Sequence, residues 1–117
     1  MSVTLFGITT CDTVRKARVW LEAQGIAYRF HDFRKDGLDA ERLAGWLDAL
    51  GWEAVLNRAG TSFRGLPEDV RAGLDRDKAA RLILANPTLV KRPVLEAEGN
   101  AHVGFKPDLY AGIFSRA

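Results

Sequence analysis

The sequence predicts a single α/β domain with the element order β–α–β, then several helices, then β–β–α. Three observations carry this prediction. In the first third of the chain, a short run of apolar residues comes first. It is followed by a segment with apolar residues at helical intervals and then by one in which polar and apolar residues alternate. The middle, at about residues 38–86, has helical spacing interrupted by glycine and proline. The last part has two short apolar runs on either side of a turn, followed by a final segment with helical spacing. A chain of 117 residues is long enough to bury a hydrophobic core without disulfides or metals.

The opening β–α–β unit follows from the spacing of apolar residues. Residues 3–6 are β-branched or apolar and predict a strand that ends at Gly7. A helix from about residue 12 to 24 is predicted by apolar residues at helical intervals, namely Val14, Ala17 and Leu21. Gly25 suits the left-handed position that follows a helix. Residues 26–33 alternate in polarity, so we expect a second strand parallel to the first.

The middle segment is predicted to be helical. A charged turn at residues 34–37 leads to a helix that is capped by Asp39 and closed by Gly51. Pro67 suits the first position of a short helix. Asp77 is expected to open a further helix, whose buried side is formed by Ala80, Ile83 and Leu84.

A β-hairpin and a helix close the chain. Residues 93–96 and 102–105 are the expected strands, and residues 97–101 form the turn between them. The final helix starts at residues 106–108, because Pro107 suits a first helical position. Its expected apolar side consists of Leu109, Ile113 and Phe114.

The single cysteine, Cys11, lies where the first strand gives way to the first helix. Either Thr10 or Asp12 can cap this helix, which places Cys11 in or beside its first turn. Unpaired backbone N–H groups and the helix dipole stabilise an anion there. Arg15 follows four residues later on the same helix face. Both features favour the thiolate, so the sequence predicts a reactive nucleophile at Cys11.

Other classes of site are less well supported. A free cysteine usually just fills space in a core, but the neighbours of Cys11 are polar. One cysteine cannot form an internal disulfide, and with His31 and His102 it makes a poor metal-binding set. A net charge of +2 does not predict nucleic-acid binding. No segment approaches the roughly 20 apolar residues of a membrane span, and no signal peptide is evident, so we expect a cytoplasmic protein without membrane contact.

Two features resemble the thioredoxin fold: a cysteine after the first strand of β–α–β, and an X-Pro pair that opens a strand of the later β–β–α unit. Together with Cys11-x-x-x-Arg15 and the segments at residues 91–94 and 103–106, they make the chain similar to the arsenate reductase-like family of ArsC, Spx and YffB proteins. The likeness is strongest to the YffB branch, through Gly7-Ile8, Cys11-Asp12-Thr13, Lys16-Ala17-Arg18, Trp20-Leu21-Glu22, residues 28–32 and residues 51–54. It spans nearly the whole chain and implies a thioredoxin-like fold with an inserted helical subdomain.

The resemblance also implies which residues bind anions. The family's oxyanion-binding arginines fall near Arg58, at Arg92 and near Lys106, where a lysine keeps the charge but lacks a planar fork. For the first of these, Arg58 and Arg64 remain alternatives, because both lie in a polar, glycine-punctuated loop predicted at residues 57–65. The family fold further implies a cis peptide bond between Arg92 and Pro93, with Pro93 beside the thiol.

The chain departs from the family pattern before and after the cysteine. Arsenate reductases of the family typically have His-Asn-Pro where this chain has Gly7, Ile8 and Thr9, so one catalytic helper is missing. The Spx branch commonly has Cys-x-x-Cys, whereas the fourth position here is Val14, so that disulfide switch is absent.

A thiol without a resolving cysteine needs an outside thiol, and glutathione is the abundant candidate. The resemblance thus implies a monothiol oxidoreductase with glutathione as co-substrate, no bound cofactor, and glutaredoxin or a protein thiol or disulfide as further partner. Cys11 would be the nucleophile. The thiolate or the anionic partner would be stabilised by Thr10, Arg15, Arg92 and Lys106, and substrate contacts would come from Arg58, Arg64 and Pro93. Two alternatives stay open: an arsenate reductase coupled to glutathione and glutaredoxin, and a non-enzymatic interaction or redox-sensing module.

Overall fold

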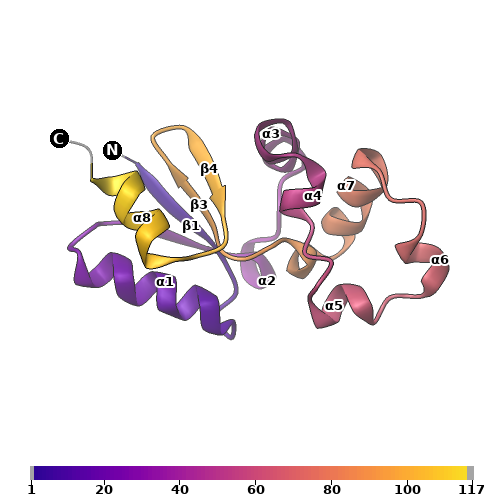
Figure 1. Cartoon of the computed structure of the whole chain (residues 1–117), viewed down its shortest axis with the longest axis horizontal. Coiled ribbons are helices and arrows are strands. Elements are labelled where there is room, and N and C mark those ends of the chain that lie inside the picture. Colours follow the sequence, from indigo (N-terminus) through magenta and orange to yellow (C-terminus); the bar gives the residue numbers. More distant parts are fainter. Residues whose placement is uncertain (1, 116–117) are drawn as a thin grey trace. The chain divides into compact units, whose positions relative to one another are not determined.

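The computed structural model describes residues 2–115 and divides them into two compact units (Figure 1). The first unit combines both ends of the chain, up to Asp32 and from Arg92 onward. The second unit is Phe33–Lys91 and contains the segment predicted as a helical insert.

The first unit contains a four-stranded sheet and two helices. Its strands are β1 (Val3–Gly7), β2 (Arg29–Asp32), β3 (Val94–Ala97) and β4 (Asn100–Val103), and its helices are α1 (Asp12–Ala23) and α8 (Pro107–Phe114). The strand order is β2-β1-β3-β4, with β1 parallel to β2 and antiparallel to β3, and with β3 antiparallel to β4. This is the thioredoxin-like β–α–β and β–β–α arrangement, which confirms the predicted fold class.

The register of the sheet gathers three loops at one of its ends. Phe6, next to the last residue of β1, pairs with Val94, the first residue of β3. Val94 also pairs with Val103, the last residue of β4. The chain that leads from β1 to Cys11, the residue that precedes β3 and the turn that follows β4 are therefore at the same end of the sheet.

One core covers the sheet face on which α1 and α8 pack. The predicted stripe of α1 is fully buried there, together with residues of β1 and β3. The stripe predicted for α8 is partly wrong, because Tyr110 is the fully buried residue and Leu109 is 39% exposed. The ring of Tyr110 packs edge-on against Phe105 at 4.7 Å and Trp20 at 5.7 Å between centroids, contacts that sequence spacing does not reveal.

The second strand is shorter than the predicted residues 26–33. Ile26 still belongs to the end of α1, since its amide donates to the Leu21 carbonyl at 3.0 Å. Gly25 has a φ of 69°, which confirms the left-handed position after the helix. The strand itself pairs only with β1, from Thr4 to Gly7.

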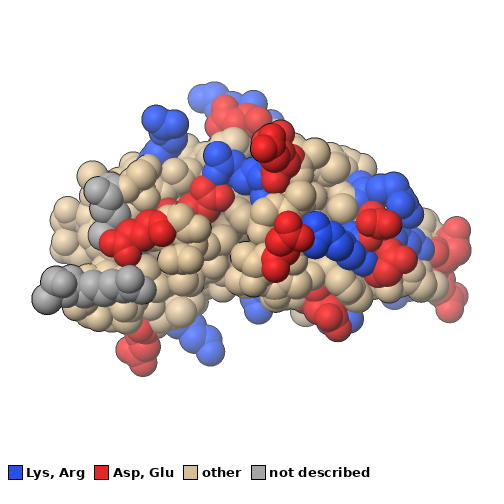
Figure 2. Space-filling model, turned by 90° about the horizontal axis from the view of Figure 1, so that it is seen from above, with Lys and Arg blue, Asp and Glu red and all other residues tan. Residues whose placement is uncertain are grey.

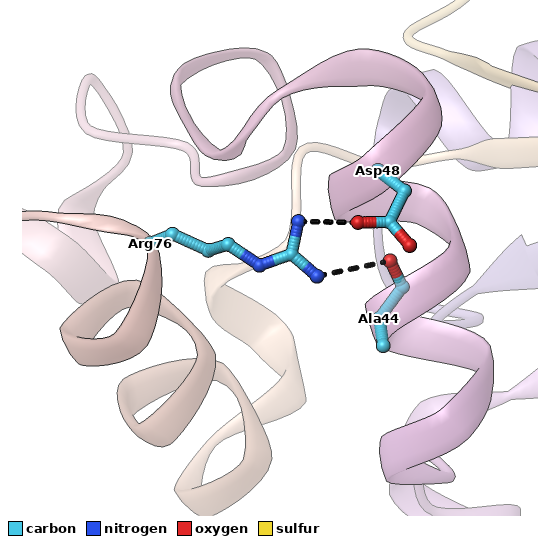
Figure 3. Close-up of polar contacts among 3 residues, drawn as sticks. All are labelled: Ala44, Asp48 and Arg76. Carbon is cyan, nitrogen blue, oxygen red and sulfur yellow. Dashed lines mark hydrogen bonds and ion pairs between the residues drawn. The ribbon is translucent and has the colours of Figure 1, made fainter.

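The second unit consists of short helices. They are α2 (Phe33–Asp36), α3 (Ala40–Leu50), α4 (Trp52–Val55), α5 (Thr61–Arg64), α6 (Glu68–Arg71), α7 (Arg76–Ala85) and the 3₁₀ turn η1 (Pro87–Leu89). Asp39 caps α3 as predicted, because its side chain accepts the Arg42 amide at 3.3 Å. Arg76 of α7 reaches α3, where it donates to Asp48 Oδ1 at 2.6 Å and to the Ala44 carbonyl at 3.5 Å (Figure 3).

Three local expectations for this unit are wrong. Where a charged turn was expected at residues 34–37, the structure has the one-turn helix α2 over residues 33–36, with Phe33 buried near the ring of Trp46. The loop predicted at residues 57–65 contains α5 with Phe63 buried, because a helix of one turn is too short to show periodicity. Asp75, not Asp77, caps α7 by accepting the Lys78 amide at 2.8 Å, and this start shifts its buried side to Ala79 and Ile83 while Leu84 is 40% exposed.

The surface mixes both signs of charge. Figure 2 shows lysine and arginine side chains interspersed with aspartate and glutamate over the face in view. Within residues 2–115, no helix has the length and apolar character needed to traverse a lipid bilayer. Neither sign of charge dominates the face in view in Figure 2.

Candidate functional site

Cys11 itself is the N-cap of α1. Its backbone is extended, with φ −84° and ψ 125°, its amide donates to the Ile8 carbonyl at 3.3 Å, and its carbonyl accepts the Arg15 amide at 3.0 Å. The expectation that Thr10 or Asp12 caps the helix is therefore wrong. Thr10 lies in the turn before the cap, and Asp12 is already the first helical residue. An N-cap side chain lies next to the second and third helical N–H groups, and no side-chain cap hydrogen bond occupies them here.

The thiol is partly accessible. Cys11 is half-buried and packs against the core cluster that includes Val14, Ala17 and Tyr110. One side of the residue is thus held by apolar neighbours while the other stays open to a partner. A half-exposed cysteine at a helix N-terminus matches the environment of reactive thiols more closely than that of inert buried ones.

A close approach between β1 and α1 sets the position of this junction. A Cβ atom added at Gly7 would lie only 2.6 Å from Cγ2 of Val14, which is fully buried. Glycine therefore lets the end of the strand contact the first turn of the helix, and the short loop to Cys11 is held between them.

Arg15 is engaged in a contact that the sequence interpretation missed. Its Nη2 forms an ion pair with Oδ1 of Asp12, within the first turn of α1. The side chains are 58% and 74% exposed, respectively. Arg15 is on the helix turn that follows Cys11, as predicted, but its positive charge is shared with a carboxylate. The spacing of three residues is the signal that could have revealed the pair.

Arg92, Pro93 and Lys106 belong to the same unit as Cys11. The Arg92–Pro93 peptide bond is cis, as predicted, and Pro93 is buried directly before β3. Nε of Arg92 is also buried. Lys106 is the exposed N-cap of α8, and its ammonium has no hydrogen-bond or ion-pair partner within residues 2–115. The sheet register places the segments of Pro93 and Lys106 at the sheet end where β1 leads to Cys11.

Arg58 and Arg64 belong to the second unit. Arg58 lies over Trp52, with its Cζ 5.3 Å from the ring centroid. Its loop is held by Asn57, whose amide donates to the Leu89 carbonyl at 2.8 Å and whose side chain accepts the Ala59 amide at 3.3 Å. Arg64 is exposed in α5 and has no polar side-chain partner among the described residues. The stacking on Trp52 gives Arg58 a defined position that the sequence alone did not indicate.

Metal-binding residues do not gather within residues 2–115, where no group of three or more His, Cys, Asp or Glu side chains could hold an ion. His31 stacks on Phe6, with ring centroids 4.8 Å apart.

Comparisons with known proteins agree with this geometry. The model of the ArsC family matches residues 6–113. A solved structure of a protein named YffB is 52% identical, covers 95% of this chain and 97% of its own, and superposes with a TM-score of 0.92. A solution structure of an arsenate reductase (ArsC) related protein from Brucella melitensis is 57% identical, covers 99% and 97%, and has a TM-score of 0.79. An uncharacterized protein of Haemophilus influenzae is 39% identical over 113 residues, which are 97% of this chain and 99% of that protein. The chain belongs to the ArsC family.

Proposed function

We propose that this protein is an arsenate reductase-like thiol oxidoreductase that works as a cytoplasmic glutathione-dependent thiol reductase. The observation that carries the proposal is the single accessible cysteine at the N-cap of α1, without a second cysteine anywhere in the chain. Such a thiol can accept one sulfur partner and must be released by another thiol. Membership of the ArsC family supports redox chemistry at a cysteine.

The reaction has two exchange steps. The Cys11 thiolate attacks the glutathione sulfur of a mixed disulfide between glutathione and a substrate thiol. The new Cys11–glutathione disulfide forms as the old disulfide breaks, and the substrate leaves as a thiolate that takes up a proton. A second glutathione thiolate then attacks the bound glutathione sulfur. Glutathione disulfide leaves and Cys11 returns to the thiolate, so each turnover converts the mixed disulfide and one reduced glutathione into the substrate thiol and glutathione disulfide.

The chain's own groups fit this chemistry. The N–H groups of the first turn of α1, to which the Cys11 side chain makes no capping hydrogen bond, would stabilise negative charge on sulfur, both before attack and as Cys11 leaves. Lys106 offers an unpaired ammonium, and we assign it, with Arg92, to the carboxylates of glutathione. Arg15 and the backbone at Thr10 and Pro93 complete the proposed surroundings of the thiol. Arg58 and Arg64 are proposed as additional anion-binding groups.

Arsenate reduction is the second candidate, and the name of the Brucella melitensis relative favours it. In that reaction Cys11 would attack arsenate, and glutathione with glutaredoxin would supply the electrons. Lysine at position 106 argues against arsenate as the substrate, because a compact oxyanion is best held by fixed bidentate donors. A third possibility is an interaction or redox-sensing module, in which Cys11 would be oxidised but would not turn over.

Mass spectrometry after treatment with glutathione disulfide tests the proposal directly. We expect one glutathione adduct on the wild type, none on Cys11→Ser, and loss of the adduct on addition of reduced glutathione. Steady-state reduction of a small glutathione mixed disulfide should depend on Cys11 in the same way. Cys11→Ser should keep its circular dichroism spectrum and should lose no thermal stability, because Cys11 is only half-buried and serine is a favourable N-cap residue. A stable adduct without turnover would favour the sensing module, and the absence of any adduct would refute the thiol reductase.

A further inference from the structure

The first turn of α1 carries a charge pair next to the nucleophile. Asp12 directly follows Cys11, and its carboxylate is ion-paired with the guanidinium of Arg15. This pair belongs to the first helical turn, whose N–H groups face the N-cap. The first turn of α1, which follows Cys11, therefore carries one carboxylate in addition to the helix dipole and one cation.

The pair has different consequences for two kinds of partner. A compact oxyanion brings negative charge to the atom that Cys11 attacks, so it is stabilised only by a guanidinium of Arg15 that is free to contact it. A disulfide has an uncharged reacting sulfur, and its carboxylates lie some bonds away. The pair is largely exposed and therefore weak. It must be broken before Arg15 can contact an oxyanion, whereas a disulfide can react while the pair stays intact.

We propose that Asp12 is a specificity-determining residue, which pairs with Arg15 and thereby disfavours attack of Cys11 on compact anions relative to neutral sulfur partners. This inference rests on the proposed role of Cys11 as nucleophile. It assigns the substrate class of the site to disulfides, and it explains this selectivity by a residue of the first turn of α1 in addition to Lys106. Asp12 acts through Arg15, so it is a positioning residue and takes no part in bond formation.

A purely structural role for Asp12 predicts a different outcome. An acidic residue in the first helical turn also stabilises the helix through the macrodipole. In that case its removal would lower the melting temperature, and it would change reactivity toward anionic and neutral partners by the same factor. The ratio of the two reactivities separates the roles.

The test compares alkylation of Cys11 by iodoacetate, which is anionic, and iodoacetamide, which is neutral. Both reagents alkylate the same thiolate with loss of iodide. The thiolate concentration and the accessibility of Cys11 therefore cancel in the ratio of the two second-order rate constants. Asp12→Asn should raise the iodoacetate-to-iodoacetamide ratio about two- to fivefold, the range that corresponds to exposed ion pairs. Asp12→Glu should leave the ratio near that of the wild type, and high salt should reduce the gain. Asp77→Asn, at the first turn of α7, is the matched control and should leave the ratio unchanged.

A double-mutant cycle identifies the route of the effect. Arg15→Ala should lower the ratio, and Asp12→Asn should add no gain in the Arg15→Ala background. An equal gain with and without Arg15 would overturn the proposal, because Asp12 would then act by its own charge. An unchanged ratio in Asp12→Asn would overturn it as well. The expected ratios without any glutathione adduct would refute the proposed thiol reductase while leaving the role of Asp12 intact.

Discussion

The amide of Gly104 donates a hydrogen bond of 2.9 Å to the carbonyl of Pro93. This contact ties the residue before β3 to the turn that leads into Lys106. Gly104 adopts a φ of 79°, a conformation that residues with a side chain rarely take. Two groups assigned to the site, the buried proline and the unpaired lysine, are thus connected through one glycine.

Gly104→Ala should therefore lower both stability and activity. A Cβ atom in the left-handed region costs about 1–2 kcal/mol, so chemical denaturation should show a loss of that size. Glutathione adduct formation should slow as well, because the turn before Lys106 is displaced. Gly112→Ala in α8 is the matched control. No atom lies within 4 Å of its added Cβ, so helix propensity should raise the free energy of unfolding by about 0.5–1 kcal/mol. Equal stability of Gly104→Ala and wild type would contradict the strain at this turn.

Tyr110→Phe should stabilise the first unit. The Tyr110 hydroxyl is buried without a hydrogen-bond partner within residues 2–115, and an unpaired buried group costs about 1–3 kcal/mol. Removal of the oxygen keeps the edge-on ring contacts with Trp20 and Phe105. Tyr28→Phe is the control and should destabilise the protein, because the Tyr28 hydroxyl donates to Glu22 at 2.7 Å and accepts from Arg18 at 3.0 Å. Urea denaturation of both variants measures the difference, and a destabilised Tyr110→Phe would mean that the hydroxyl is paired in solution.

The same tyrosine should make the protein sensitive to alkali. Burial raises the pKa of Tyr110 above its ordinary value of 10.0, so the unfolded state ionises first. Below pH 10 the Tyr110 hydroxyl is neutral in both states and the free energy of unfolding does not change with its ionisation. As pH rises from 10 toward the raised pKa, ionisation in the unfolded state lowers the free energy of unfolding by at most about 1.4 kcal/mol per pH unit. Denaturation curves between pH 9 and 12 should show a shallower decline for Tyr110→Phe than for the wild type. Parallel curves would show that the hydroxyl ionises as readily in the folded state.

Gly7→Ala should displace the junction that holds Cys11. The added Cβ would lie 2.6 Å from Val14 Cγ2, and overpacking of this kind costs about 1–3 kcal/mol. Thermal melts should show the loss, and alkylation of Cys11 by iodoacetamide should change in rate. Val14→Ala removes the clashing methyl groups, so the double variant should lose less stability than the sum of the two single variants. Additive losses would show that the contact between Gly7 and Val14 is not tight.

Sequence patterns predicted the order of the elements in the first unit, because these elements have a clear period. The bounds of the strands differ: β3 and β4 are Val94–Ala97 and Asn100–Val103, whereas residues 93–96 and 102–105 were expected. Val14, Ala17 and Leu21 define one face of α1, and Gly25 ends the helix in the expected conformation. The four-residue helices of the second unit were not predicted in full. A single turn such as α5 shows no repeat, and burial of Phe63 there depends on tertiary packing.

The strand-to-helix junction that holds Cys11 was predicted correctly, and the contacts around it were predicted less well. The position of Cys11 at a strand-to-helix junction followed from neighbouring residues, but the identity of the cap depended on backbone angles. The ion pair of Arg15 with Asp12, three residues before it, was not predicted, although the spacing allows it as readily as a contact with Cys11, four residues before it. The stacking of Arg58 on Trp52 could not be predicted, because cation–π contacts have no fixed spacing along a chain.

Lys106→Arg should separate disulfide chemistry from arsenate chemistry. Arsenate is a compact tetrahedral oxyanion, which a planar guanidinium can hold with two hydrogen bonds, whereas the carboxylates of glutathione accept a point charge. The wild type should thus form the glutathione adduct readily and reduce arsenate slowly with glutathione and glutaredoxin. Lys106→Arg should raise kcat/KM for arsenate by about tenfold, the effect of one charge-assisted hydrogen bond of about 1.5 kcal/mol, without faster adduct formation. Lys35→Arg in α2 is the control and should alter neither reaction. Rapid arsenate turnover by the wild type, with no gain from Lys106→Arg, would make arsenate reduction the better assignment.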